Sequence, residues 1–159
     1  MHTGFCVYIE CIMLKIVELL DNIKLIIYAM KEKCDMQLQD FYKMLGGSYQ
    51  EIKERLQSDE LILRLTFKFL NDKSYENLCR AVEEEAYEEA FRAAHTLKGV
   101  CQNLSFGELG ASSGELTELL RNRETVPVDR ERCMELFGQV CADYRVVIEA
   151  ITTLKGQKD

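Results

Sequence analysis

The sequence predicts an all-α protein, an antiparallel up-and-down four-helix bundle with additional short helices at its amino end. One proline and nine glycines occur in 159 residues, too few for an all-β fold, which needs a turn every ~8–12 residues. Apolar residues recur at helical spacing from Leu38 onward. Long helical segments follow one another with short links, which is typical of an antiparallel bundle.

Each expected helix has a start or stop signal. The first runs over 38–45 and ends at Gly46 and Gly47. Ser48 with Glu51 forms a capping box that begins the second, because hydroxyl and carboxylate satisfy free amides at a helix start. The remaining helices are expected at about 58–70, started by Ser58 and Asp59; 75–83; 87–104; 105–123, started by a capping box of Ser105 and Glu108; and 129–154, capped by Asp129.

Composition restricts the classes of function. Acidic side chains outnumber basic ones by 27 to 20, for a net charge of −7 and a pI near 5.0. This charge disfavours broad contact with nucleic-acid phosphates. The seven cysteines include no C-x-x-C pair and have no histidine at ligand spacing, so neither a metal site nor a disulfide framework is indicated. We expect reduced thiols in a cytoplasmic protein.

Residues 1–36 form an apolar or amphipathic extension ahead of the expected bundle domain at 37–159. A membrane-spanning helix needs ~20 nearly uncharged residues, whereas this stretch is interrupted by Glu10, Lys15, Glu18, Asp21 and Lys24. We therefore expect no membrane span. Two interpretations stay open. The extension is an amphipathic helix that docks or pairs between subunits, or it is upstream sequence read through from an early start codon.

The helix expected at 87–104 carries the information about function. Its apolar residues fall on one broad face, which we expect to be core. Opposite them, at i, i+3, i+4 and i+7, stands a stripe of His95, Lys98, Gly99 and Gln102, which Glu88, Phe91 and Arg92 extend. His95 is therefore expected to face solvent.

Three neighbours make this histidine more than an ordinary surface residue. Gly99 lies in mid-helix, where glycine costs about 1 kcal/mol relative to alanine, and its missing side chain leaves a dent that admits a partner's loop. Lys98, with Arg92 nearby, places positive charge where a phosphoryl group on His95 would lie. Phe91 is an apolar ring on a polar side, either a stray surface aromatic or an interface anchor.

The run Ala94-His95-Thr96-Leu97-Lys98-Gly99 resembles the signature of histidine-containing phosphotransfer (HPt) domains, the relay modules of two-component signalling. The resemblance extends over about 38–154. It implies a four-helix bundle in which His95 carries the phosphoryl group, Lys98 stabilises it and Gly99 clears space for the docking protein. Several family members hold the second imidazole nitrogen with a glutamine on the next helix. Here that position falls near Thr117, with Ser113 one turn earlier and Gln102 as another candidate.

The resemblance also implies partners. These are response-regulator receiver domains, a hybrid sensor histidine kinase, or both, and Mg²⁺ is expected on the receiver, with no cofactor on this chain. A neutral imidazole is a competent nucleophile, so His95 needs no general base. The chain would be a relay intermediate, and a turnover enzyme is not expected.

Rival functions fit the residues less well. The sequence has no Gly-rich nucleotide loop and no length for an ATP-binding domain, so no ATP-dependent kinase activity is expected. A di-metal carboxylate bundle needs Glu-x-x-His, but Arg92 lies three residues before His95. The alternative that stays open is a non-catalytic helical module that docks receiver domains without productive transfer.

Overall fold

The structure is a computed structural model, and it describes residues 37–121 and 127–157. Within these ranges every regular element is helical, which confirms the expected all-α class. The proposed extension over residues 1–36 lies outside the described residues, as do residues 122–126 before the last helix.

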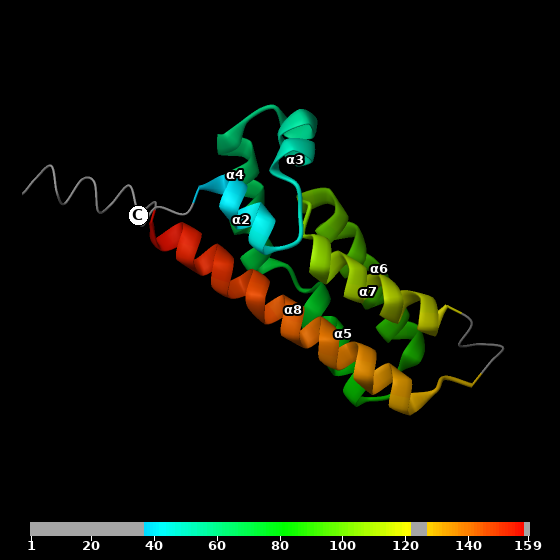
Figure 1. Cartoon of the computed structure of the whole chain (residues 1–159). Helices are drawn as coiled ribbons and strands as arrows, with labels where there is room; N and C mark the ends of the chain where they lie inside the picture. The colour runs from blue at the N-terminus through cyan, green and yellow to red at the C-terminus, as the bar shows by residue number, and fades with distance from the viewer. Residues whose placement is uncertain (1–36, 122–126, 158–159) are drawn as a thin grey trace, which may run out of the picture. The chain divides into compact units, whose positions relative to one another are not determined.

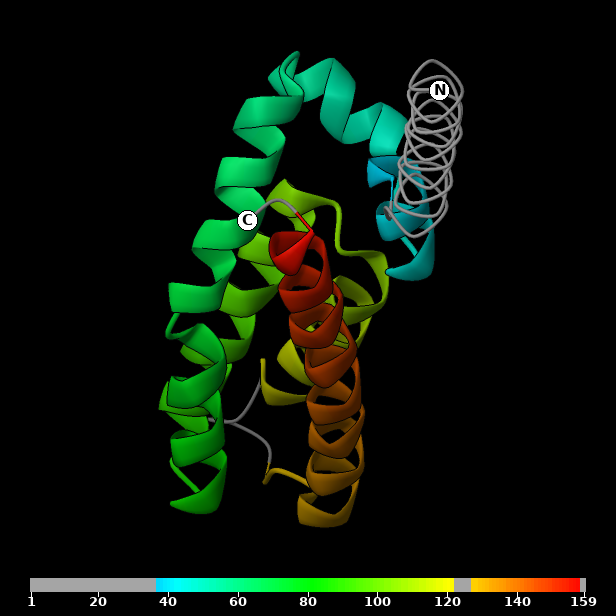
Figure 2. The same cartoon turned by 90° about the vertical axis from the view of Figure 1, so that its left-hand side faces the viewer.

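Four helices lie side by side and form the bundle (Figure 1). They are α5 (Ser74–Glu83), α6 (Tyr87–Leu104), α7 (Gly107–Leu120) and α8 (Arg130–Gly156). In chain order, α5 packs on α6, α6 on α7, and α7 on α8. Upstream of α5, α4 (Asp59–Lys68) and a 3-10 turn (Phe69–Asn71) continue along the same side of the bundle (Figure 2).

Two short helices precede α4, α2 (Leu38–Met44) and α3 (Tyr49–Leu56). They lie at the end of the bundle where α8 terminates (Figure 1). Their connection touches the α6–α7 turn backbone to backbone: a Cβ on Gly47 would lie 1.8 Å from the carbonyl oxygen of Ser105. A Cβ on Gly107 would lie 2.0 Å from the carbonyl oxygen of Gly46. Only glycine permits this approach.

The core is one apolar cluster that includes the short helices. Phe106, at the α6–α7 turn, is its aromatic centre, with ring centroids 5.2 Å from Phe69, 6.2 Å from Phe41 and 6.4 Å from Tyr42. Burial raises the pKa of the Tyr42 phenol to about 12, and its hydroxyl lies 3.2 Å from that of Thr66. Since α2 supplies two of these rings, the amino-terminal helices are part of the core.

Three of the expected helix caps are confirmed. Ser48, Ser58 and Asp129 accept hydrogen bonds from the backbone amides of Glu51, Leu61 and Arg132. Each bond satisfies an amide that has no partner within its helix.

The expected capping box at Ser105 and Glu108 is wrong. Ser105 ends α6 in the left-handed conformation (φ 55°), and its buried hydroxyl has no hydrogen-bond partner within residues 37–121 and 127–157. The amide of Glu108 donates instead to the carbonyl of Leu45, at 3.1 Å. The α2–α3 connection therefore caps α7, a long-range contact that local sequence spacing does not encode. The structure gives α7 an end at Leu120, and Arg123, near which this helix is expected to end, lies outside the described residues.

Among the described residues, no helix is both long enough and apolar enough to cross a membrane.

Candidate functional site

The site begins with α6, which spans 87–104 as expected and divides into two faces. Ala94 and Leu97 are fully buried, whereas His95 between them is exposed. Val100 departs from the expected core face, because it is only partly buried. The helix thus fixes His95 on an outward ridge supported by a packed inner face.

Phe91 lies against His95. The two rings are four residues apart on α6, with centroids 6.0 Å apart and planes inclined by 31°. Phe91 also packs partly on the core. Neither earlier interpretation of Phe91 included this contact, although the i, i+4 spacing is the signal for it. The phenyl ring limits the orientations open to the imidazole.

Lys98 reaches from α6 across to α7. Its stem passes over Gly114, where an added Cβ would lie 3.7 Å from Lys98 Cε, and its Nζ lies 3.8 Å from Glu118 Oε1. Arg121 holds the same carboxylate with two hydrogen bonds of 2.7 Å. These contacts lower the pKa of Glu118, mainly through Arg121, so it is ionised at neutral pH. Sequence reasoning missed Glu118, because the pairing joins two helices.

Gly99 has open space around it. A Cβ built on this residue would meet no atom within 4 Å. Nothing inside the described chain therefore requires glycine there, although glycine weakens a helix interior. The vacant position lies one turn from His95, on the same stripe.

A groove between α6 and α7 adjoins this stripe. It has a volume of about 550 Å³. Lys98 and Gln102 line it from α6, Gly110, Ala111 and Gly114 line it from α7, and residues 46–48 with Glu51 close one end of it. Small residues on α7 leave room for Lys98, so the cation lies on the α7 side of the ridge.

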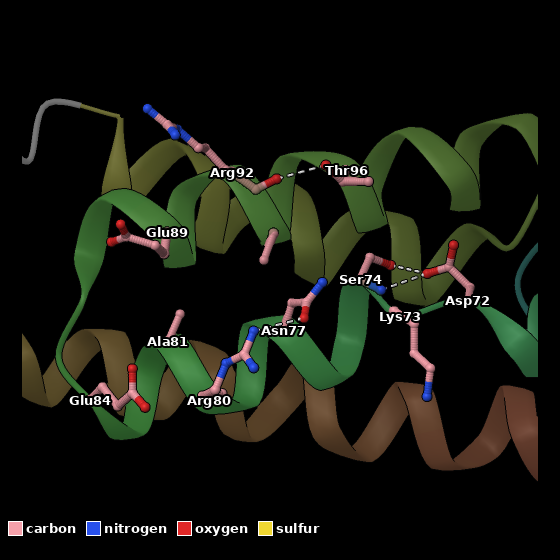
Figure 3. Close-up of a pocket in the computed structure, with 11 residues that line it drawn as sticks. Asp72, Lys73, Ser74, Asn77, Arg80, Ala81, Glu84, Glu89, Arg92 and Thr96 are labelled. Carbon is pink, nitrogen blue, oxygen red and sulfur yellow. Dashed lines mark hydrogen bonds between the residues drawn. The ribbon is translucent and has the colours of Figure 1, made fainter.

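Arg92 lies at the edge of a second groove, between α5 and α6, and its side chain points away from α5 (Figure 3). Figure 3 shows Arg92 and Thr96 on one wall and Asn77 and Arg80 on the other. Arg92 is paired with Glu88 at 2.9 Å. The remaining lining residues carry both signs of charge, so this groove presents no net basic field. The expected cationic patch is therefore split, with Lys98 and Arg92 each beside a carboxylate.

Thr117 and Ser113, the two candidates for orienting the imidazole, are both fully buried on α7. The Thr117 hydroxyl donates to the Ser113 carbonyl at 2.7 Å. The Ser113 hydroxyl has no hydrogen-bond partner among the described residues. Gln102, the third candidate, is exposed on α6. The role of all three toward His95 stays a prediction.

Arg55 supports the carboxyl end of the ridge from another helix. Arg55 of α3 donates to the carbonyls of Gln102 and Asn103, at 3.0 and 2.9 Å, and so satisfies acceptors at the carboxyl end of α6. Sequence reasoning missed it, because the contact spans 47 residues.

Burial raises the pKa of Cys101 to about 12, so this thiol stays protonated and does not act as a second nucleophile on α6.

In the described part of the chain, no group of three or more histidine, cysteine or carboxylate side chains is arranged to hold a metal ion.

Comparison with known families supplies the decisive observation. The family model described as Hpt domain matches residues 63–156, more than half of the chain. The chain belongs to the Hpt domain family. The match contains the whole of α6, so the helix with the exposed histidine lies within the matched segment. Hpt domains act in two-component phosphorelays, which supports a phosphotransfer role and interaction with response-regulator or kinase partners. No curated protein and no solved structure matches the chain.

Proposed function

We propose that this Hpt domain is a phosphocarrier that accepts a phosphoryl group on His95 from an aspartate of a receiver domain and passes it to another. The observation that carries the proposal is the arrangement on α6. His95 is exposed, Lys98 lies on the same stripe, and Gly99 leaves open space one turn away. Phosphoryl transfer depends mainly on position and on charge stabilisation, and an exposed ridge offers both to a docked partner.

The chemistry needs little from this chain. The lone pair of the unprotonated ring nitrogen of His95 forms a bond to phosphorus while the bond between phosphorus and the aspartate oxygen breaks. The aspartate leaves as a carboxylate, and the proton on the other ring nitrogen passes to water. Lys98 offsets the negative charge on the phosphoryl oxygens. Among the residues that the structure describes, no carboxylate is hydrogen-bonded to His95 to activate water, so the phosphorylated histidine should persist until a second receiver takes the group.

The partners follow from this chemistry. The receiver, free or fused to a hybrid sensor kinase, would supply the activated acyl phosphate, Mg²⁺ and its own lysine. Gly99 and the α6–α7 groove would receive a loop of that receiver. A cytoplasmic location belongs to the same proposal, and the four described cysteines, which are all free thiols, support it.

The test is transfer from a receiver domain. The full chain is incubated with a panel of receivers phosphorylated on aspartate, and label that is labile to acid and stable to base is measured on the chain. We expect such label with at least one receiver and none in His95→Gln. Label that persists in His95→Gln would overturn the site assignment.

A second measurement separates transfer from docking. Binding of each receiver is measured without phosphorylation, for example by calorimetry. Receivers that bind but never transfer would contradict the carrier proposal and favour the non-catalytic docking module.

The orienting residue is tested in the same assay. Thr117→Val and Ser113→Ala each remove one buried hydroxyl, and Gln102→Ala removes the exposed amide. The variant that slows transfer without weakening receiver binding identifies the residue that holds the imidazole. Equal rates in all three would show that none of them does.

A further inference from the structure

We infer that Glu118 is a positioning residue for Lys98: it holds the ammonium group over α7 while His95 is unphosphorylated and releases it to the phosphoryl group afterwards. This inference rests on the proposed function, because it concerns the cation that would meet the phosphate. It assigns a role to a residue on the neighbouring helix that the α6 signature does not include.

The geometry suggests a holding contact that is easily exchanged. The Lys98 side chain is 26% exposed and lies along α7, so its stem is packed and its charge ends beside Glu118. The distance of 3.8 Å between Nζ and Oε1 is long for an ion pair. Glu118 is 56% exposed, and its shorter bonds go to Arg121. Water and Arg121 can therefore satisfy Glu118 when Lys98 leaves.

Charge determines the direction of the exchange. A phosphoryl group carries between one and two negative charges at neutral pH and offers three acceptor oxygens, whereas Glu118 carries one charge that Arg121 already offsets. Lys98 lies three residues after His95, on the same face of α6, so a change of side-chain rotamer is enough to move its charge. The phosphoryl group is thus the stronger partner, and Glu118 is the weaker competitor.

The competition predicts the sign of a substitution. When Glu118 is replaced by a neutral residue, Lys98 no longer has to break an ion pair before it binds the phosphoryl group. The substitution therefore favours the phosphorylated state of His95. If Glu118 instead aimed Lys98 productively at His95, the same substitution would disfavour that state.

The experiment uses phosphoramidate, a small phosphodonor, so that no receiver is needed. The nitrogen–phosphorus bond of phosphoramidate breaks, a nitrogen–phosphorus bond forms at His95, and ammonia leaves with the proton. The concentrations of phosphoramidate and ammonium are fixed, and equilibrium is approached from the phosphorylated and from the unphosphorylated chain. Mass spectrometry then gives the ratio of phosphorylated to unphosphorylated chain. We expect Glu118→Gln to raise this ratio about two- to fivefold, the range that exposed ion pairs produce.

The chain offers a matched control. Glu135 on α8 pairs with Arg132 at 2.6 Å, again with the partners three positions apart in the sequence, and is similarly exposed. Glu135→Gln removes the same charge and the same kind of arginine pair, and we expect an unchanged ratio. An equal rise in both variants would mean that only net charge matters and would overturn the inference.

A double-mutant cycle tests whether Glu118 acts through Lys98. In a Lys98→Met background, we expect Glu118→Gln to lose at least half of its effect. A full effect in that background would show direct repulsion of the phosphate and contradict a positioning role. A lowered or unchanged ratio in Glu118→Gln alone would also overturn it.

Failure of the two proposals is distinguishable. If phosphoramidate and phosphorylated receivers both leave His95 of the unmodified chain unlabelled, the proposed function fails. If His95 is labelled and Glu118→Gln matches the unmodified chain, the proposed function stands and the role of Glu118 fails.

Discussion

The aromatic ring of Phe91 lies against the imidazole of His95, with 6.0 Å between centroids and 31° between planes. Because Phe91 is partly packed on the core, it presents a fixed surface to a side chain that is otherwise exposed. We expect Phe91→Ala to slow transfer to His95 about two- to fivefold, since the freed imidazole must give up rotamers to react. Single-turnover transfer rates measure this.

Phe137→Ala is the control for this first prediction. Phe137 is also a partly buried phenylalanine, but it lies on α8. Both variants should lower the melting temperature, and only Phe91→Ala should slow transfer. Equal transfer rates in the two variants would show that the Phe91 contact does not orient the imidazole.

Gly99→Gln should separate folding from docking. The open space around Gly99 accommodates the side chain, and replacing a mid-helix glycine is expected to stabilise the domain by about 0.5–1 kcal/mol. Transfer from a receiver should fall at least about tenfold, because the new side chain fills the place of a partner's loop. Melting temperature and transfer rate are measured together.

Gly138→Gln provides the matched comparison. A Cβ on Gly138 in α8 also meets no atom within 4 Å. We expect a similar gain in stability with an unchanged transfer rate. Unimpaired transfer in Gly99→Gln would contradict the argument that the missing side chain serves the partner.

Gly47→Ala should destabilise the fold. Its Cβ would lie 1.8 Å from the Ser105 carbonyl oxygen, a backbone atom that cannot move aside cheaply. We expect a loss of about 1–3 kcal/mol in the free energy of unfolding, the usual cost of overpacking. Urea denaturation measures it, with Gly156→Ala as the control because that residue has open space. An unchanged free energy of unfolding in Gly47→Ala would mean that the α2–α3 connection does not pack tightly against the α6–α7 turn.

Low pH should weaken the contact between α3 and α4 that Asp59 makes with Tyr49 and Lys53. Asp59 accepts hydrogen bonds of 2.8 Å from Lys53 and from Tyr49, and these bonds lower the pKa of Asp59, with Lys53 the larger cause. A lowered folded-state pKa means that the contribution is present above the unfolded-state value and is lost as pH falls through the folded-state value. The groups are exposed, so we expect a small effect, less than about 2 °C in melting temperature.

Asp59→Asn removes this pH dependence. The variant should match the unmodified chain at a pH below the lowered pKa of Asp59, where both side chains are neutral, and melt at a lower temperature near neutral pH. Calorimetric scans over pH measure the difference. A difference that persists unchanged to low pH would contradict the titration of Asp59 as its cause.

The sequence was sufficient for the features that depend on local periodicity. The bounds of α6, the burial of Ala94 and Leu97 and the exposure of His95 all follow from helical spacing, and they were predicted correctly. The features that it could not predict join distant segments. Arg55 at the end of α6, Glu118 beside Lys98 and Leu45 at the start of α7 act through tertiary contacts.

The error at Ser105 shows why these contacts matter. The spacing to Glu108 satisfies the rule for a capping box, but the left-handed conformation of Ser105 belongs to the end of α6. A residue cannot end one helix in that conformation and also begin the next with the extended backbone that a cap needs. With only two residues between α6 and α7, Ser105 can either end α6 or cap α7, and the tertiary contacts of the fold determine that it ends α6.

The backbone joint between the α2–α3 connection and the α6–α7 turn has a consequence for engineering. The family match starts at residue 63, but Phe41, Tyr42 and the carbonyl of Leu45 lie before that boundary. A chimera that grafted only the matched segment onto another protein would lose two of the rings that pack on Phe106 and the carbonyl that accepts from the amide of Glu108. A segment intended for transplantation should therefore begin at residue 37. It then includes α2 and the close contact of Gly46 and Gly47 with the α6–α7 turn, together with the histidine helix.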